Sequence, residues 1–464
     1  MSKNEELDKI VNLAKRRGFI YPSSEIYGGL ANTYDFGPYG VALKRNLQQS
    51  WWKRFISGRE DIFPIDSSII MNPMVWEASG HVESFSDVMV EDKKNQQRHR
   101  ADHLIEDYFA EKGEEVKVDG KTAEELQRII EKEGIKSPSG NELSEAKQFN
   151  NLFETEIGII SGDKNKAYLR GEIAQGLFIN YKNIIDSFSP KLPFGIGQSG
   201  KAFRNEITAG KFTFRTLEFD LMEFEYFFDA ETNSWEELFE YWKEEVHQFA
   251  LSIGLNQSKL RWRPHEEFEL SHYSSRTEDL EYEFPWGYKE VFAVAYRTDF
   301  DLKNHMEKSG KNLQYITEDG RKIIPHVVEP TFGLSRLVTV ILMDAYQEQE
   351  LEDGRYRTLL KLNKQIAPVQ AAVFALQKDD GLVKLSHKIY EDLLSATSIS
   401  LEHHNSGNIG KMYRKQDEIG TPYCVTVDYD SLKDESVTIR DRDTMAQERI
   451  KIKDLQKYLE DKLV

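Results

Sequence analysis

The sequence predicts an α+β protein with a strand-rich core, a polar helical insertion and a C-terminal α/β domain. Strand-like apolar segments with turn signals occupy 61–73 and much of 151–350. The intervening stretch 84–150 is strongly polar and includes "EELQRIIEKEGIKSPSG". From 367 onward strands and helices alternate over about 100 residues, which is typical of a separate domain with a partly parallel sheet. A length of 464 residues is enough for two or three domains.

The composition indicates a folded protein, with 39% hydrophobic and 30% charged residues. The single cysteine, Cys424, excludes a disulfide framework and a cysteine-based structural zinc site, and it fits a reducing compartment. No apolar run reaches the roughly 18 residues of a membrane span, and no secretion signal opens the chain, so we expect a cytoplasmic protein without a membrane partner. The net charge of −18 argues against non-specific binding of nucleic acid, so any RNA partner would have to meet local basic clusters.

The segment 1–83 begins with an amphipathic helix, "MSKNEELDKIVNLAKRRGF". A second helix is predicted after Gly37, because Pro38 suits the first helical turn. Its apolar stripe recurs every four residues, at Leu43, Leu47, Trp51 and Phe55. The following strand at 61–73 contains Pro64, which demotes it to an edge or interface position and makes a dimer seam plausible.

The other predicted segments are the inserted helical subdomain at 84–150, the core at 151–350, a linker at 351–366 and the C-terminal domain at 367–464. The last of these reads as a strand from 367, a helix at 381–396, a strand, a helix at 409–418 and the strand "PYCVTVDYD". A hairpin and a final helix complete it.

The stretch "KAFRNEITAGKFTFRTLEFDLMEFEYFF" (201–228) predicts a hairpin with one charged face. Strand alternation places Arg204 and Glu206 together, with a loop at 208–211. In the return strand it groups Arg215, Leu217, Phe219, Leu221 and Glu223. Arginine suits phosphate, a phenyl ring suits a stacked base, and a carboxylate suits an amine. The alternative interpretation is a solvated strand face with salt bridges.

A second element with one basic residue follows at 323–346, "IIPHVVEPTFGLSRLVTVILMDAY". It predicts a strand, a glycine turn and an apolar helix with Arg336 in its first turn. An anion bound at that helix start would offset the unfavourable position of the cation. The alternative is an arginine exposed there by chance.

These segments resemble the class II aminoacyl-tRNA synthetases. The helix and strand at 38–73 are similar to the first motif of that family, which builds a dimer interface, while "FRNE" and "FGLSR" resemble the second and third motifs. The closer resemblance is to the dimeric glycyl-tRNA synthetases. It is carried by "RGFIYPSSEIYGGLANTYDFGPYGVALK", "MNPMVWEASGH", "RADHLIEDY", "KLPFGIGQSGKAFRNEI", "YRTDFDLKNH", "EPTFGLSR" and "QDEIGTPYCVTVD". It implies an antiparallel core sheet and an anticodon-binding domain.

The resemblance implies an ATP site with Arg204 and Arg336 as catalytic residues. Arg204 would hold the α-phosphate, Glu206 would read the adenine amine and Phe219 would stack on adenine. Arg215 and Arg336 would grip the β- and γ-phosphates. Glu290 would contact Mg²⁺ and ATP, although an ordinary strand carboxylate is the alternative. The further implied ATP contacts are Asn205, Phe214, Lys289 and Gly333.

The resemblance also implies sites for glycine and tRNA. Three carboxylates, Glu172, Glu223 and Glu329, would surround the glycine ammonium, with Arg100, Phe219 and Thr331 beside the substrate. The candidate RNA contacts of the C-terminal domain are Lys411, Arg414, Lys415, Arg440 and Arg442, for which a solvated helix face and hairpin is the alternative. The implied protein is a homodimer that joins glycine to tRNA(Gly) using ATP with Mg²⁺.

The chain departs from the family pattern at three places. Gly171 and Ile173 stand where proline and threonine are usual, and Leu217 stands where the return strand usually has a second arginine. Serines replace a cysteine pattern in "IKSPSGNEL", so we expect no zinc. Two other functions stay open, a non-catalytic synthetase-like nucleic-acid-binding subunit and a class II synthetase of another specificity.

Overall fold

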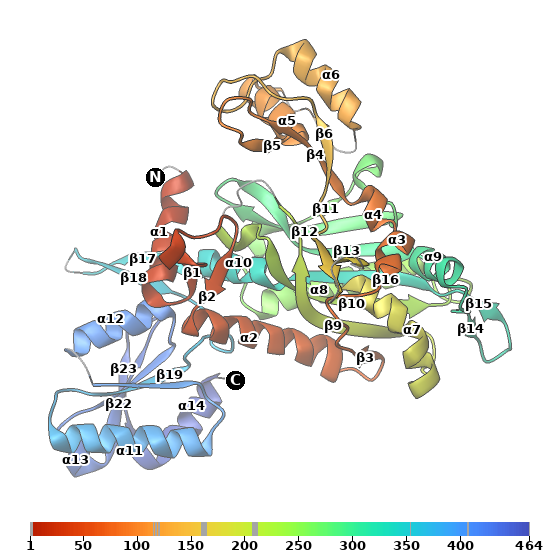
Figure 1. Cartoon of the computed structure of the whole chain (residues 1–464). Coiled ribbons are helices and arrows are strands. Elements are labelled where there is room, and N and C mark those ends of the chain that lie inside the picture. The colour runs from red at the N-terminus through yellow and green to blue at the C-terminus, as the bar shows by residue number, and fades with distance from the viewer. Residues whose placement is uncertain are drawn as a thin grey trace.

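The computed structural model describes residues 3–463 apart from 115, 117, 119–120, 159–164, 207–211, 353 and 406–407. The chain forms a central sheet domain, a small domain that projects from it and a C-terminal domain at the opposite corner (Figure 1). No helix among the described residues is long and apolar enough to span a bilayer.

The central sheet has seven strands in the order β11–β12–β13–β16–β10–β9–β3. Their bounds are β3 (Ile62–Pro64), β9 (Phe194–Phe203), β10 (Glu218–Phe228), β11 (Leu260–Pro264), β12 (Arg276–Phe284), β13 (Gly287–Thr298) and β16 (His326–Gly333). Every neighbouring pair is antiparallel except β3 with β9. The α+β fold class with an antiparallel core sheet is therefore confirmed.

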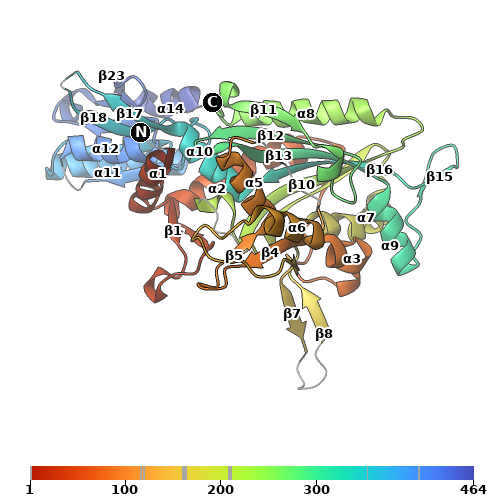
Figure 2. The same cartoon turned by 90° about the horizontal axis from the view of Figure 1, so that it is seen from above.

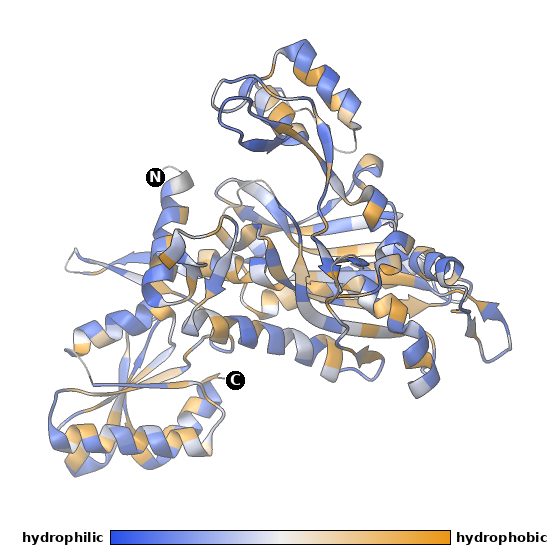
Figure 3. Ribbon diagram, in the orientation of Figure 1, coloured by the Kyte–Doolittle hydropathy of each residue, from blue (hydrophilic) through white to orange (hydrophobic). Residues whose placement is uncertain are grey.

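One face of this sheet packs on the main hydrophobic core. Met222 and Phe224 of β10 lie there with residues of α2 (Pro38–Trp52), α8 (Trp235–Ser252) and α10 (Leu334–Ala345). Gly37 caps α2, Pro38 opens it, and the predicted stripe from Leu43 to Phe55 is fully buried. Apolar residues are concentrated on the central strands and on the sides of the helices that cover them (Figure 3).

The opposite face is only partly covered. Phe227 of β10 and Ile196 of β9 pack under α7 (Ala174–Phe188), with Leu302 of α9 (Phe300–Ser309). Figure 2 shows α8 along one side of the sheet and α7, α9 and the projecting domain on the other. The same face beyond Phe227 is left for the site described below.

The predicted strand at 61–73 is much shorter than expected. Only Ile62–Pro64 pairs as a strand, and it lies at the sheet edge, as Pro64 predicted. Proline has no N–H to donate, and the N–H of Ile65 makes one further bond, to the Gly197 carbonyl of β9 at 2.9 Å. The chain then continues through α3 (Pro73–Ala78) and α4 (His81–Ser84).

The projecting domain is mixed α/β, and the prediction of a helical subdomain at 84–150 was wrong. It contains the antiparallel sheet β5–β4–β6, formed by β4 (Ser86–Glu91), β5 (Arg98–Arg100) and β6 (Lys147–Asn150). The sheet packs on α5 (Ala101–Glu111) and α6 (Ala123–Glu133) around its own small core, which includes Val90 and Ile105. The strands were missed because β5 and β6 are short and polar.

The C-terminal domain has the predicted alternating order. Its sheet runs β20–β19–β21–β22–β23, with β19 parallel to β20 and β21 and the last two strands antiparallel. The elements are β19 (Ala371–Ala375), α11 (Asp380–Ala396), β20 (Leu401–His404), α12 (Ile409–Ile419), β21 (Tyr423–Val427), α13 (Ser431–Asp434), β22 (Ser436–Asp441), β23 (Gln447–Lys451) and α14 (Leu455–Leu463). The predicted linker at 351–366 contains one arm of a hairpin, β17 (Tyr346–Glu350) and β18 (Tyr356–Leu360).

Another helix, α1 (Lys3–Arg17), packs Ile10 and Leu13 into the main core. The remaining strands form short hairpins and pairs: β1 (Ile20–Pro22) with β2 (Tyr34–Phe36), β7 (Glu154–Ile157) with β8 (Asn165–Tyr168), and β14 (Tyr315–Ile316) with β15 (Lys322–Ile323).

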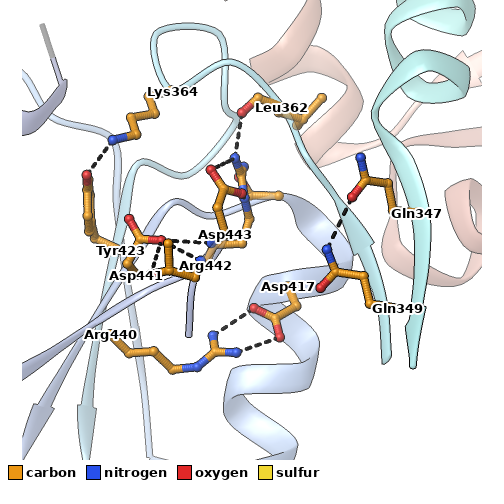
Figure 4. A network of polar contacts seen from close by, with 12 residues as sticks. Gln347, Gln349, Leu362, Lys364, Asp417, Tyr423, Arg440, Asp441, Arg442 and Asp443 are labelled. Carbon is orange, nitrogen blue, oxygen red and sulfur yellow. Dashed lines mark hydrogen bonds and ion pairs between the residues drawn. The ribbon is translucent and has the colours of Figure 1, made fainter. Parts of the chain in front are cut away.

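Buried arginines join the C-terminal domain to the segment before it (Figure 4). Arg442 donates hydrogen bonds to the carbonyl oxygens of Gly420 and Leu362 at 2.7 and 2.9 Å. Asp417 of α12 accepts two hydrogen bonds from Arg440 at 2.8 and 3.0 Å, and one from Arg357 of β18 at 3.2 Å. The Arg357 bond attaches the hairpin β17–β18 to α12, and the Arg442 bond to Leu362 attaches the C-terminal domain to the segment after that hairpin.

Candidate active site

A cavity of about 200 Å³ lies on the partly covered face of the central sheet. It collects ten residues that the sequence predicted to act together: Arg204, Glu206, Phe214, Arg215, Phe219, Glu223, Glu290, Thr331, Gly333 and Arg336. They come from β10, β13, β16, the start of α10 and the segment between β9 and β10.

The charged residues of the hairpin reach the cavity from a turn rather than from paired strands. β9 ends at Phe203 and β10 begins only at Glu218, so Arg204, Glu206 and Arg215 lie outside the regular ladder. The Arg204 guanidinium lies 5.4 Å from the Phe219 ring centre, and its Nε donates to the Gly171 carbonyl at 3.0 Å. The loop predicted at 208–211 falls outside the described residues.

A second guanidinium enters from the first turn of α10. Arg336 donates from Nη1 to the Glu290 backbone carbonyl at 2.8 Å and pairs with its carboxylate at 3.0 Å. It also lies 4.4 Å from the Phe214 ring centre. Burial, together with the charges of Arg100 and Arg336, lowers the pKa of Arg215, against the opposing effect of Glu206. A polyanion bound here would relieve this repulsion between cations.

The three predicted carboxylates converge next to this cationic end, and all are buried. Glu223 faces Gln198 of β9 and Thr331 of β16 across the sheet. Burial, followed by the charges of Glu329 and Glu172, raises the pKa of Glu223 well above its ordinary value. Burial also raises the pKa of Glu172, but the His81 ring at 3.1 Å outweighs this effect and holds it below the ordinary range.

Arg297 of β13 is a central residue of this cluster that the sequence analysis did not single out. Its guanidinium is completely buried and donates to Asp301 at 2.9 and 3.0 Å and to both oxygens of Glu329 at 3.0 and 3.1 Å. The Tyr273 ring stacks on it at 3.8 Å. A signal was present, because an arginine ends the apolar run "VFAVAYR" and has an aspartate four residues later.

Several predicted contacts lie elsewhere. Arg100 pairs with Asp87 at 3.1 Å and with Asp102, outside the cavity lining. Lys289 is exposed and does not line the cavity, because strand alternation turns it away from Glu290. The backbone N–H of Asn205 donates to the Asn151 carbonyl, and Asn205 does not line the cavity either.

The three positions at which the sequence departs from the family pattern have different surroundings in the structure. Leu217 precedes β10 and does not line the cavity, whereas Thr216 does. The predicted grouping of Leu217 with Arg215 and Phe219 therefore fails, because regular strand alternation begins only at Glu218. Ile173 is buried against Ala202 and Leu221. Gly171 lies so close to Leu152 and Phe85 that an added Cβ would approach them to 2.9 and 3.1 Å.

The C-terminal basic residues divide into two groups. Lys411 and Arg414 line an open hollow of about 840 Å³ between α12 and the hairpin β17–β18, beside Tyr413 and the 67% exposed Tyr356. Lys415 pairs with Glu402 at 2.8 Å. Arg440 and Arg442 are only 6% and 2% exposed, and their guanidiniums are occupied by the junction bonds of Figure 4. Their prediction as RNA contacts was therefore wrong.

A central antiparallel sheet whose cavity is lined by Arg204, Arg215 and Arg336, followed by a C-terminal α/β domain, is the arrangement of a class II aminoacyl-tRNA synthetase. Residues 370–462 match the family model described as "Anticodon binding domain". The chain is 48% identical to the glycine–tRNA ligase of Clostridium acetobutylicum over 100% of both chains. It is 48% identical to that of Acetivibrio thermocellus over 100% of this chain and 99% of the other. It is 46% identical to that of Geobacillus thermodenitrificans over 98% and 97%. The chain belongs to the glycine–tRNA ligase family.

Proposed function

We propose that this chain activates glycine with ATP and transfers the glycyl group to the 3′ end of tRNA(Gly). The glycine carboxylate would attack the α-phosphate, the bond to the β-phosphate oxygen would break, and pyrophosphate would leave. The observation that carries the proposal is the arrangement along one face of β10, where Phe219 lies beside Arg204 and Glu223 lies two rows further on. A nucleotide and a small ammonium ligand would then meet above Leu221.

The cationic end would bind MgATP as a substrate. Arg204 would stabilise charge on the α-phosphate, and Arg215 with Arg336 would hold the outer phosphates. Glu290 is a hard oxygen donor beside Arg336 and suits the Mg²⁺ of that substrate. Such a site works by positioning and electrostatic stabilisation, so a nucleophilic side chain is not needed.

The carboxylate end would bind the glycine ammonium through Glu223, with Glu172 and Glu329 behind it. A small buried pocket can reject every larger side chain sterically. A pocket that must reject a smaller amino acid gains only about 1–3 kcal/mol of discrimination per missing methylene. This difficulty does not arise for glycine, because no amino acid is smaller.

The hollow beside α12 would receive part of the tRNA. Lys411 and Arg414 supply cations for phosphate, and the exposed Tyr356 ring can stack on an unpaired base. We propose that the hairpin β17–β18 forms one wall of this RNA site.

We further propose a homodimer acting in the cytoplasm. The short edge strand β3 and the exposed apolar side chains of Ile26, Tyr27 and Leu30, which are 88%, 87% and 61% exposed, would be covered by a second copy. Sedimentation of the purified protein at micromolar concentration should give twice the chain mass, and a monomer would contradict this part.

Amino-acid-dependent exchange of pyrophosphate into ATP tests the proposed function. Glycine should support exchange, whereas alanine and serine should not. Arg204→Ala should lower exchange about 10²- to 10³-fold because it removes a charge-stabilising donor. Arg449→Ala, on the C-terminal hairpin, serves as the control and should leave exchange unchanged. Equal exchange with alanine would point to another specificity, and no exchange with any amino acid would favour a non-catalytic binding protein.

A further inference from the structure

An additional carboxylate lies beneath the proposed glycine site, one row deeper in the sheet than Glu223. The odd-numbered side chains of β10 share a face. Phe219, Leu221 and Glu223 line the cavity, and Phe227 belongs to the core under α7. Glu225 lies between them, at 0% exposure. Neither of its carboxylate oxygens has a hydrogen-bond partner within the described part of the chain.

The neighbour of Glu225 across the sheet is also a carboxylate. Glu223 faces Thr331 in the β10–β16 register, so Glu225, two residues further along β10, faces Glu329. Like charges placed directly opposite each other destabilise a sheet. Burial, followed by the charge of Glu329, raises the pKa of Glu225 well above its ordinary value.

The cations nearby are committed to other carboxylates. Arg297 donates its hydrogen bonds to Asp301 and Glu329, and His81 pairs with Glu172. From α9, His305 contacts Gln175, and burial lowers the pKa of its ring.

Other groups also face this cluster. The Tyr273 ring stacks on Arg297, and the charge of Arg204 acts on Glu223 from the cavity side. The free protein therefore holds five buried carboxylates around the Arg297 guanidinium: Glu172, Glu223, Glu225, Glu329 and Asp301. A second buried guanidinium, that of Arg170, also acts on Glu223, while it donates to the carbonyls of Ser67 and Lys201.

We propose that Glu225 is a neutral carboxylic acid in the free protein and releases its proton when the ammonium group of glycine binds beside Glu223. The inference rests on the proposed function. The ammonium group supplies the positive charge that the cluster lacks, which favours the ionised form of its carboxylates. The O–H bond of Glu225 breaks, its electron pair stays on the carboxylate, and the proton passes to the buffer.

Glu225 is a positioning residue in this scheme, because it adjusts the charge around Glu223 and Glu329 without touching the substrate. Binding that releases one proton strengthens with rising pH, by up to about tenfold per unit below the pKa of the free protein. The affinity for glycine should therefore increase with pH and then become constant.

Calorimetry of glycine binding to the full-length protein, at one pH in buffers of different ionisation enthalpy, measures the proton directly. The wild type should release a proton, or a substantial fraction of one, per glycine bound. Glu225→Gln has nearly the same shape and cannot ionise, so it should bind glycine with clearly less proton release than the wild type, any remainder coming from Glu223, whose pKa burial also raises. Its KM for glycine in the exchange assay should also depend less on pH.

Glu278→Gln is the matched control, the same change at a buried glutamate of the same sheet. Glu278 pairs with Arg276 and with Lys243 of α8 on the opposite face, so its replacement should leave the proton release unchanged. Glycine binding without proton release in the wild type would overturn the inference while the proposed function stands, even if the variant did not fold. Unchanged release in Glu225→Gln would overturn it as well. Absence of both glycine binding and exchange would instead overturn the proposed function, and this inference with it.

Discussion

At the scale of single residues, the buried guanidinium of Arg297 compensates the carboxylates beneath the site. Arg297→Met should lower the free energy of unfolding of the central domain by about 3–5 kcal/mol, because it leaves Asp301 and Glu329 buried without a counter-charge. All seven tryptophans lie between 51 and 286 and outside the projecting domain, so tryptophan fluorescence during urea unfolding reports on the central domain.

The control for this change is Lys182→Met on α7, which removes an exposed ion pair with Asp186 at 3.0 Å. Such a pair contributes at most about 1 kcal/mol. An equal effect of the two substitutions would contradict the view that Arg297 is structurally central.

Strand alternation singled out Arg204 and Glu223 from the sequence, and the first turn of an apolar helix singled out Arg336; the structure brings all three to one cavity. Glu225 could not be separated from surface charges in the same way, and the signal for Arg297, an apolar run ending in arginine with an aspartate four residues later, did not show that it is buried. Burial depends on which strands become neighbours, and a single sequence does not specify this. The same ambiguity explains the error at Arg442, a hairpin arginine whose N–H groups bind buried carbonyls.

At the scale of elements, helices with caps and apolar stripes were predictable, whereas short polar strands were not. Gly37, Pro38 and the stripe ending at Phe55 specify α2 locally. The strands of the projecting domain depend on pairing with one another, and β5, "RHR", has no apolar alternation of its own. Sequence patterns therefore located this domain but predicted an all-helical structure in place of a mixed α/β one.

Two turns of the projecting domain are fastened by the carboxylate of Asp92. It accepts hydrogen bonds from Ser137 at 2.6 Å, from Asn141 at 3.0 Å and from the backbone N–H of Lys94 at 2.8 Å. Asp92→Ala should therefore increase hydrogen exchange in the peptides 92–97 and 137–141. Asp107→Asn, at an exposed position of α5, should not. We propose that this carboxylate removes the need for a metal here, so stoichiometric zinc in the purified protein would contradict it.

The same carboxylate predicts a pH dependence. Burial raises the pKa of Asp92, but its hydrogen bonds outweigh burial and hold the pKa below the ordinary value. Its stabilising effect is therefore complete above the unfolded pKa of about 3.9 and is lost as the pH falls through the lower folded value. The protection of these two turns should decline in acid in the wild type. In Asp92→Asn it should depend less on pH.

At the scale of the whole molecule, the C-terminal domain contacts the central domain through polar side chains at several points. Tyr39 at the start of α2 donates to Glu402 of β20 at 2.7 Å, and Arg16 of α1 pairs with Glu418 of α12 at 3.0 Å. Together with Arg357 and Arg442, these contacts fix the proposed RNA hollow relative to the active-site sheet. The order of the domains was predictable from the sequence, but these contacts were not, because Tyr39 and Arg16 meet partners more than 360 positions away and Arg357 meets Asp417 60 positions away.

Arg442→Ala tests whether this junction aligns the tRNA with the active site. The change leaves the buried carbonyls of Gly420 and Leu362 without their donor, at a cost of about 1–3 kcal/mol each, and should loosen the C-terminal domain. Pyrophosphate exchange needs only the central domain and should stay within about twofold, while aminoacylation should fall on the order of tenfold or more. Arg449→Ala, whose ion pairs with Asp428 and Asp434 stay within the C-terminal domain, should change neither rate. A parallel loss of exchange and aminoacylation in Arg442→Ala would show instead that the junction supports the catalytic sheet itself.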